Sequence, residues 1–370
     1  MRKTIAGVWV ITALLVSNAY AFGPVGHETI GAVADQRLAN KPAAAKITKL
    51  LDGLSLAEAS LLADRIKEWD NLPADNLHSF HLPQHPQIEA QLRAFWQANP
   101  PSPNEVKNKP SHHWFHYTDV PVLGDEKYSD GKTGRSQWDI VHMMPFCIRV
   151  LRGVESDQNA RKITKPVALI LLAHYVGDIH QPLHVGAEYF NSDGKPVNPD
   201  KSKTGFPDEG GNSLVLILRE ISDHGPSDGN VKLHGYWDHE TVTTALQMIR
   251  QEIVNEQPGH PGKAIDEELI RRLATREPQS WKLAAQIDPK NWPEAWANEV
   301  LVVAKEAHRR LEFAKITLEV HHGKTIAAGL AKEKLMPDRV SYRDWSGKVV
   351  KAEIHKAGWR LAALLEQIIR

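Results

Sequence analysis

The sequence predicts a mainly α-helical, single-domain protein with a small β-hairpin. Most of the chain carries apolar residues at helical spacing, and only Ser213–Arg219 has the composition of a clear strand. The 370 residues contain no internal repeat, and their 42% hydrophobic content is enough for one large core. We therefore expect one packed domain over residues 22–370, preceded by a separate N-terminal segment.

Residues 1–21 have the pattern of a signal peptide. Arg2 and Lys3 supply positive charge, Ile5–Val16 is a short apolar run, and Ala19–Ala21 is an A-x-A cleavage site. The run is too short to span a bilayer comfortably. Cleavage would make Phe22 the mature N-terminus, whose free amino group and carbonyl oxygen can chelate a metal. We expect a periplasmic or secreted bacterial protein without stable membrane association.

Charge and cysteine content narrow the class of function. Lys+Arg and Asp+Glu both number 45, so the protein has no net charge that would attract a nucleic acid or a membrane surface. An anionic substrate must then be held locally, for which metal ions can supply the charge. The chain has 19 histidines and one cysteine, Cys147, which excludes an internal disulfide. We expect Cys147 to be a small buried apolar residue.

The first part of the chain predicts two helices and a long loop-rich segment. Glu28–Leu38 and Leu56–Trp69 both carry apolar residues at helical spacing. In the second helix Asp64 and Lys67 are three residues apart, which on its own indicates a solvated ion pair. Leu72–Ser111 is rich in Pro, Asn and His, and we expect a surface insertion there with one short helix at about Ile88–Gln97.

The rest of the chain predicts further helices. Thr164–Ile179 must end near Ile179, because Pro182 lacks an N–H and disfavours helix just before it. Gly186–Gly211 is rich in Gly, Asp, Asn and Pro and predicts a loop. The other helices are expected at Ser136–Arg152, Thr241–Glu256, Asp266–Ala274, Pro278–Gln286, Trp292–His322 and Val349–Ile369.

A histidine–aspartate pattern recurs in this helical framework. His174 and Asp178 are four residues apart and share one helix face, and His184 follows the break at Pro182. His234 and Asp238 repeat the spacing. One such pair is common on solvated helices, but two pairs and an added histidine form a nitrogen and oxygen ligand set suited to zinc.

Other histidines have simpler interpretations. Those in or beside Leu72–Ser111 are expected to be solvated loop residues, and they are His78, His81, His85, His112 and His113. The segment Trp114–Val120 is aromatic and carries His116 and Asp119, and a core aromatic patch is the plain alternative there.

The order and context of these residues resemble the zinc-dependent single-strand nucleases of the S1/P1 family, which share their fold with zinc-dependent phospholipase C. The resemblance spans nearly the whole mature chain. Its motifs are FGPVGH at 22–27, ADR at 63–65, HYTD at 116–119, HYVGDIHQPLH at 174–184, GGN at 210–212, HGYWD at 234–238 and AGWRLAA at 357–363.

The resemblance implies three zinc ions per chain. The first would be held by Asp64, His116, His174 and Asp178, and the second by His184, His234 and Asp238. The third would be held by the amino and carbonyl groups of Phe22, by His27 and by Asp178, which bridges two ions. The family usually has Trp at the position of Phe22, and its fungal and plant members carry disulfides that this chain lacks.

The resemblance also implies a mechanism. A hydroxide shared by the first and third zinc ions and oriented by Asp64 would attack phosphorus, leaving a 5′-phosphate. Lys67 would add a cation to the transition state, where the family has arginine. Tyr117 would stack on an unpaired base and Asp119 would contact the base edge. In the alternative interpretation, Tyr117 is a core residue and Asp119 a turn residue.

The expected function is a monomeric zinc phosphodiesterase that cleaves single-stranded DNA and RNA and removes 3′-phosphates from nucleotides. Zinc-dependent phospholipase C is the alternative enzyme, but that family has glutamate at the position of Asp238. A zinc-binding periplasmic protein without catalysis is the other alternative, and it would not need Asp178 as a bridge.

Overall fold

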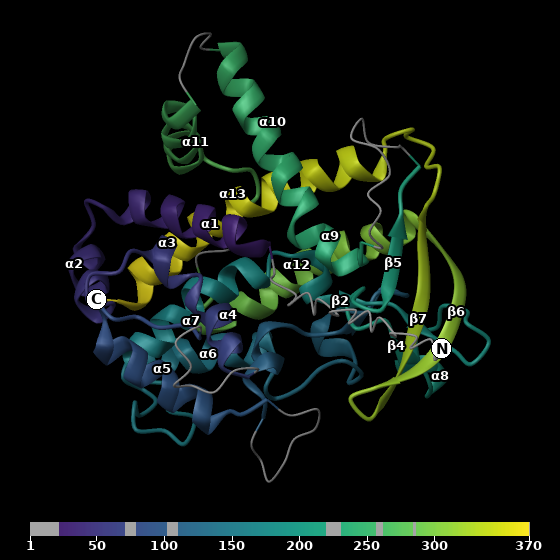
Figure 1. Cartoon of the computed structure of the whole chain (residues 1–370), viewed down its shortest axis with the longest axis horizontal. Helices are drawn as coiled ribbons and strands as arrows, with labels where there is room; N and C mark the ends of the chain where they lie inside the picture. The colour runs from purple at the N-terminus through teal and green to yellow at the C-terminus, as the bar shows by residue number, and fades with distance from the viewer. Residues whose placement is uncertain are drawn as a thin grey trace, which may run out of the picture.

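The computed structural model describes residues 22–70, 79–101, 110–219, 231–256, 262–283 and 286–369. This part of the chain is mainly helical with three small sheets, which confirms the predicted fold class (Figure 1). The expected signal peptide at 1–21 and His78 lie outside the described residues. None of the described helices is both long and apolar enough to cross a membrane.

Helix α7 (Lys165–Asp178) lies at the centre of the fold. Thr164 caps its N-terminus, Pro166 occupies its first turn, and every residue from Val167 to Asp178 is buried. A helix that is apolar on all sides must be enclosed by other elements. The elements that enclose it include α1 (Gly23–Leu38), α3 (Leu56–Ala59), α4 (Leu62–Arg65), α5 (Pro86–Ala98), α6 (Ile140–Leu151) and α13 (Tyr342–Ile368).

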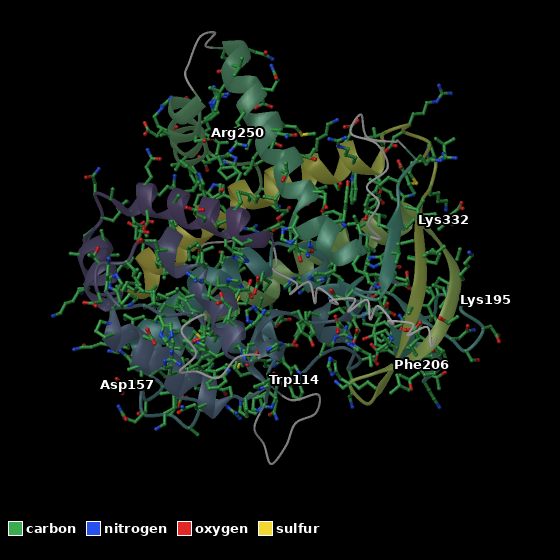
Figure 2. The ribbon with its side chains drawn as sticks, in the orientation of Figure 1. Trp114, Asp157, Lys195, Phe206, Arg250 and Lys332 are labelled. Atoms are coloured by element: carbon green, nitrogen blue, oxygen red, sulfur yellow. The ribbon has the colours of Figure 1, made fainter. Side chains whose placement is uncertain are left out.

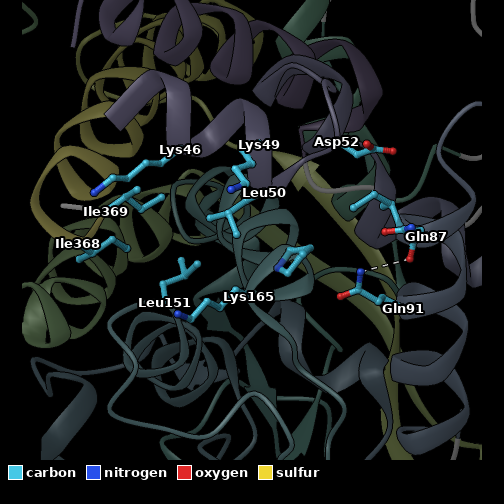
Figure 3. Close-up of a pocket in the computed structure, with 12 residues that line it drawn as sticks. Lys46, Lys49, Leu50, Asp52, Gln87, Gln91, Leu151, Lys165, Ile368 and Ile369 are labelled. Carbon is cyan, nitrogen blue, oxygen red and sulfur yellow. Dashed lines mark hydrogen bonds between the residues drawn. The ribbon is translucent and has the colours of Figure 1, made fainter. Parts of the chain in front are cut away.

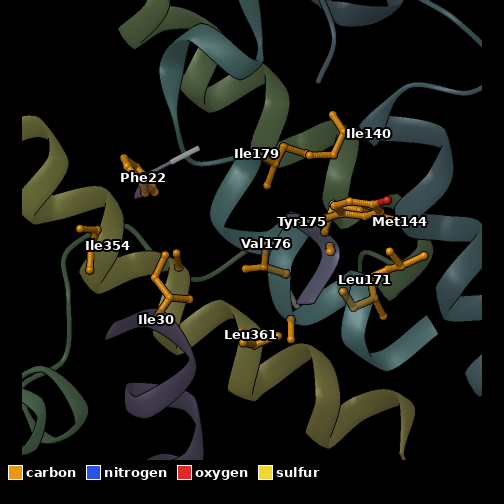
Figure 4. Close-up of a cluster of buried hydrophobic side chains, with 14 of the residues drawn as sticks. Phe22, Ile30, Ile140, Met144, Leu171, Tyr175, Val176, Ile179, Ile354 and Leu361 are labelled. Atoms are coloured by element: carbon orange, nitrogen blue, oxygen red, sulfur yellow. The ribbon is translucent and has the colours of Figure 1, made fainter. Parts of the chain in front are cut away.

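The N-terminal and C-terminal helices pack side by side against α7 (Figure 1). Phe22, Ile30 and Leu361 belong to one buried cluster with Val176 of α7 (Figure 4). Residues Leu361, Leu364, Leu365 and Ile368 of α13 are all buried, as the amphipathic pattern predicts. Cys147 is also buried, and burial raises the pKa of its thiol. This packing fixes the start of α1 against the end of α7.

Three segments in the first and last thirds of the chain differ from what the sequence predicts. Leu56–Trp69 is divided into α3, α4 and the 3-10 helix η1 (Ile66–Asp70). The helix predicted at Pro278–Gln286 is wrong, because its described residues form turns and irregular backbone. The segment 72–111 includes α5, which buries Ile88, Leu92 and Phe95 and is therefore part of the core rather than only a surface element.

The prediction of one helix at Trp292–His322 is wrong in its second half. Helix α12 (Trp292–Arg309) is followed by strands β6 (Leu311–His321) and β7 (Lys324–Glu333). His322 and Gly323 both have positive φ, as the tight turn of a two-residue hairpin requires. The β-branched residues of β6 also favour a strand over a helix. The hairpin is thus an antiparallel arm following α12.

The sheets are small and lie at one side of the helical body (Figure 1). Strand β5 (Leu214–Ile217), within the predicted strand, pairs in parallel with β7, giving the order β5-β7-β6. Two further pairs are β1 (Val120–Pro121) with β2 (Gly186–Ala187), and β3 (Tyr189–Phe190) with β4 (Phe206–Pro207). The remaining elements are α2 (Pro42–Leu50), η2 (His112–His116), η3 (Tyr128–Asp130), η4 (Pro182–His184), α8 (Pro199–Ser202), α9 (Leu233–Asp238), α10 (Glu240–Glu256), α11 (Gly262–Thr275) and η5 (Pro289–Asn291).

Candidate metal centre

The histidines and aspartates singled out in the sequence come from six elements that meet at the C-terminal end of α7. His174 and Asp178 lie on the last turns of α7, and the chain then turns at Pro182 so that His184 lies in η4. The other candidates are His27 in α1, Asp64 in α4, His116 in η2, and His234 and Asp238 in α9. All eight side chains are buried, so none of them is a solvated surface residue.

Asp178 lies at the middle of the larger group. One carboxylate oxygen, Oδ2, is 2.9 Å from Nδ1 of His116 and 3.2 Å from Nε2 of His174, and Oδ1 is 3.3 Å from Nε2 of His27. Although burial opposes ionisation, the nearby imidazoles of His174, His116 and His27 hold the pKa of Asp178 well below its usual range. One buried carboxylate therefore faces three imidazole rings from both of its oxygens.

Asp64 brings a second carboxylate to the same rings. Its Oδ1 is 3.6 Å from Nε2 of His174, 3.8 Å from Nδ1 of His116 and 2.6 Å from Nζ of Lys67. Although burial opposes ionisation, Lys67 and the two histidines lower the pKa of Asp64. Asp64 is buried and the Lys67 side chain is 11% exposed, so the two form a largely buried ion pair, in contrast to the solvated pair that the spacing alone indicates.

The rings of His27 and His174 stack with their centroids 3.8 Å apart and their planes at 12°. This close approach depends on Gly177 of α7. A Cβ atom at that position would be 2.6 Å from Nδ1 of His27, which is far inside a van der Waals contact. The absence of a side chain at Gly177 therefore lets α1 place His27 directly against the end of α7.

His184, His234 and Asp238 form a second group. Nε2 of His184 is 3.1 Å from Nε2 of His234, which is 3.5 Å from Oδ2 of Asp238. Nδ1 of His184 lies 2.8 Å from the carbonyl oxygen of His116, and Nδ1 of His234 lies 2.7 Å from that of Gly210. Each Nδ1 must carry the proton to donate to its carbonyl, which leaves both Nε2 atoms with lone pairs.

The protonation of this second group follows from burial. Burial lowers the pKa of both histidines, to about 3 for His234, so both rings are neutral at neutral pH. Two nitrogen lone pairs that face each other at 3.1 Å repel unless a cation lies between them. Burial raises the pKa of Asp238 well above its usual range, and Nε2 of Gln181 donates to its Oδ1 over 2.9 Å.

Unpaired buried atoms show that both groups fit metal ions. Nδ1 and Nε2 of His27, Nε2 of His174, Oδ1 of Asp178 and Oδ2 of Asp238 are buried without a hydrogen-bond partner. Each unsatisfied buried polar group costs about 1–3 kcal/mol, so such atoms are normally paired. The donors are imidazole nitrogens and carboxylate oxygens, the set that zinc prefers in sites without thiolates. The fit supports metal binding at these residues.

Phe22 lies at the start of α1, fully buried and in the left-handed backbone region with φ of 48°. Its carbonyl oxygen accepts a hydrogen bond from the N–H of Gly26. A Cβ at Gly23 would lie 2.8 Å from the carbonyl oxygen of Asp238, so the start of α1 packs against the end of α9. The metal-ligand role of Phe22 stays a prediction.

Tyr117 and Asp119, the predicted substrate residues, follow η2 and are half-buried. The N–H of Thr118 donates to the carbonyl of His184, and the N–H of Asp119 donates to that of Gly134. Burial, with help from the nearby carboxylates Asp208 and Glu209, raises the pKa of Asp119 to about 8. The segment is therefore held beside the second group, and its carboxyl keeps a proton at neutral pH.

The candidate ligands make further buried hydrogen bonds that the sequence does not predict. The carbonyl of Ser60 accepts from Nδ1 of His174 at 2.6 Å, and Gln181 bonds both Asp238 and the N–H of Leu183. Such partners orient metal ligands and fix their tautomers. Only Gly210 and Gln181 lie within motifs of the sequence, GGN and HYVGDIHQPLH, whereas Ser60 acts through its backbone and leaves no signal.

A further polar group lies outside the predicted ligands. Oδ1 of Asp70 is 3.3 Å from Nε2 of His112, and Oδ2 is 2.6 Å from Nε2 of His113. Trp96 also donates to Oδ1 over 2.6 Å. Burial lowers the pKa of His112 to about 4. His112 is thus buried, contrary to the expectation of a solvated loop histidine. Because three donors already satisfy one carboxylate, we assign the group to the packing of α5 against η1 and η2.

A surface pocket of about 460 Å³ is separate from this centre (Figure 3). Its lining includes Lys46 and Lys49 of α2, Ile88 of α5 and Lys165, the first residue of α7. His174 and Asp178 lie roughly 14–20 Å farther along the helix axis at 1.5 Å per residue. The pocket therefore takes no part in the chemistry of the ligand groups.

Comparison with known proteins agrees with this geometry. The sequence model of the family described as S1/P1 Nuclease matches residues 22–370. Endonuclease 5 of Arabidopsis thaliana is 25% identical over 315 residues, which are 84% of this chain and 84% of that protein. Endonuclease 3 of the same plant is 31% identical over 151 residues, covering 39% of this chain and 42% of that protein.

Proposed function

Since the chain belongs to the S1/P1 nuclease family, and is accordingly an endonuclease that hydrolyses nucleic acids, we propose that it does so with three zinc ions. The observation that supports zinc most is the set of unpaired imidazole and carboxylate atoms around Asp178 and Asp238. Asp64, His116, His174 and Asp178 would hold one ion, and His184, His234 and Asp238 another. His27, Asp178 and the backbone of Phe22 would hold the third.

Zinc bound at these residues would lower the pKa of a coordinated water to about 7 and offset the charge of a phosphodiester. Asp64, which accepts a hydrogen bond from Lys67 at the edge of the larger group, would orient the attacking water. The Nζ of Lys67, 2.6 Å from Asp64, carries a largely buried positive charge next to it. That charge would stabilise the negative oxygens as phosphorus becomes five-coordinate, and breakage of the bond from phosphorus to the 3′ oxygen would leave a 5′-phosphate on the product.

The substrate would be single-stranded DNA or RNA, with 3′-phosphates of nucleotides as smaller substrates. Tyr117 offers a half-buried ring for stacking, and stacking is possible only on a base that is not enclosed in a duplex. Asp119, protonated at neutral pH, would donate a hydrogen bond to an acceptor on the base edge. Both residues lie within three positions of His116, so a base held here would bring its phosphate close to the ligand groups.

Removal of residues 1–21 would complete the centre. The proposed cleavage frees the amino group of Phe22, which is buried at the start of α1 next to α9. A free amine is a metal donor, whereas the amide nitrogen of an uncleaved chain is not. The enzyme would therefore acquire its third ion only after export to the periplasm or the medium.

The test uses protein that begins at Phe22, with its metal content measured after loading with zinc. This protein and an Asp178→Asn variant are incubated with single-stranded DNA, RNA, duplex DNA, 3′-nucleotides and phosphatidylcholine. We expect three zinc ions per chain and cleavage of single strands to 5′-phosphorylated products, lost in the variant. Release of phosphocholine with intact nucleic acid would instead indicate a phospholipase C. Zinc binding without turnover of any substrate would contradict both enzymatic functions.

A further inference from the structure

The tip of the β6–β7 hairpin lies next to the segment that carries Tyr117 and Asp119. Lys324, the first residue of β7, places its Nζ 5.5 Å from the centre of the Trp114 ring. Figure 2 shows Trp114 near this end of the hairpin and Lys332 toward its other end. Trp114 and Lys324, which are 210 positions apart in the sequence, are thus neighbours beside the proposed base site.

The tip is held in place rather than projecting freely. Nδ1 of His321 lies 3.0 Å and 3.1 Å from the two carboxylate oxygens of Glu209. Farther down β7, the hydroxyl of Ser213 donates to the carbonyl of Ala327. Glu209 and Ser213 flank Gly210, whose carbonyl holds His234 of the second ligand group. One short loop therefore positions both the hairpin tip and a metal ligand.

The charge of Lys324 acts in a region that is otherwise acidic. Burial, Asp208 and Glu209 raise the pKa of Asp119, whereas Lys324 lowers it. The carboxylates of Asp208 and Glu209 would repel a polyanion, and a lysine at their edge offsets this repulsion. Lys324 is exposed, and no carboxylate of the described residues lies within ion-pair distance of its Nζ. Its ammonium is therefore available to an added anion.

We propose that Trp114 and Lys324 form a second nucleotide subsite for single-stranded nucleic acid, beside the base site at Tyr117 and Asp119. A base stacks on the Trp114 ring, which Lys324 now covers, while the ammonium moves from the ring to a phosphate. Because Lys324 is exposed to solvent, its ammonium is held only weakly over the half-buried Trp114 ring, and little free energy is lost when it moves to a phosphate. The subsite rests on the proposed function, because it extends the path of the same strand.

The first test measures the salt dependence of binding. Zinc-loaded protein is titrated with a fluorescein-labelled oligothymidylate of about ten nucleotides, whose phosphorothioate linkages resist cleavage, at several salt concentrations. We expect Lys324→Gln to weaken binding roughly tenfold at low salt. The variant should also reduce the slope of log K against log salt by about 0.7, the value for one lost phosphate contact on a single strand.

Lys332→Gln is the matched control. Lys332 is an exposed lysine of the same strand, and it lies opposite Glu312 of β6 at the far end of the hairpin. Its substitution should leave both the affinity and the slope unchanged. If Lys324→Gln keeps the slope of the unaltered protein, or if Lys332→Gln changes it equally, the subsite is wrong.

The second test addresses stacking. Trp114→Leu should weaken binding of the same oligonucleotide by roughly tenfold, and Trp114→Phe should restore most of the affinity, since any aromatic face stacks on a base. A role in packing alone would leave binding unchanged in both variants and would overturn the proposal.

The two proposals fail separately. Binding that depends on Lys324 and Trp114 without any cleavage of unmodified strands would contradict the nuclease mechanism and keep the subsite. Normal cleavage with binding indifferent to both residues would keep the mechanism and overturn the subsite. Failure of the unaltered protein to bind the oligonucleotide would overturn the subsite as well.

Discussion

Single carboxyl groups in this site differ in protonation because their neighbours differ. Asp178 faces three imidazole rings, which keep its pKa well below the usual range despite its burial. Asp119 is half-buried beside Asp208 and Glu209, and its partial burial and these carboxylates raise its pKa to about 8. The first carboxylate is thus prepared to bind cations and the second to donate a hydrogen bond.

This difference predicts how substrate binding depends on pH. Below about pH 8 the folded protein keeps the proton on Asp119, and the carboxyl donates to the base. As the pH rises above 8, the proton leaves, the donor is lost, and the new charge repels phosphate. We expect KM for single-stranded DNA to increase roughly tenfold from pH 7 to pH 9, which corresponds to ~1.4 kcal/mol.

Asp119→Asn provides the comparison for this prediction. The amide is a donor at every pH, so its KM should vary little between pH 7 and pH 9. Steady-state kinetics at saturating zinc measures both proteins. An equal increase of KM in the two proteins would show that another group is responsible.

At the scale of elements, close packing between helices is what brings the ligands together. Two glycines make it possible: Gly177 of α7 admits the ring of His27, and Gly358 of α13 admits Val33 of α1. A glycine inside a helix destabilises the helix by about 1 kcal/mol relative to alanine. At both positions the close packing that glycine allows offsets this loss of stability.

Gly358→Ala is therefore expected to destabilise the fold. The added Cβ would lie 2.6 Å from Cγ1 of Val33, and α1 would have to shift away from α13. We predict a loss of about 1–3 kcal/mol in the free energy of unfolding, measured by denaturant titration. Gly235→Ala in α9 is the control, since no atom lies within 4 Å of its added Cβ. Equal stability of the two variants would contradict this account of the α1–α13 contact.

The elements also show what the sequence can and cannot predict. His174, Asp178 and His184 could be placed because helical spacing and Pro182 act locally. The hairpin after Arg309 is not predicted, since a long apolar pattern does not by itself distinguish a helix from a strand. The group of Asp70, His112 and His113 depends on packing between η1 and η2, which no spacing along the chain reveals.

For the whole molecule, metal binding and folding should be coupled. The eight side chains proposed as ligands come from six elements spread from α1 to α9, so the complete groups exist only in the folded chain. Without metal, several of their buried atoms have no partner, and the folded state carries that cost. An ion that binds the folded chain and not the unfolded one stabilises it by about 2.7 kcal/mol at a hundredfold excess over Kd.

We therefore predict that zinc raises the melting temperature by about 5 °C or more, and that the increase grows with zinc concentration. Calorimetry of chelator-treated and zinc-loaded protein beginning at Phe22 measures the difference. In Asp178→Asn the increase should be much smaller, because the bridging ligand has lost its charge, while Lys332→Gln should behave like the unaltered protein. A melting temperature that is indifferent to zinc would mean that the two groups of ligands hold no metal, and that packing alone bears the cost of their unpaired atoms.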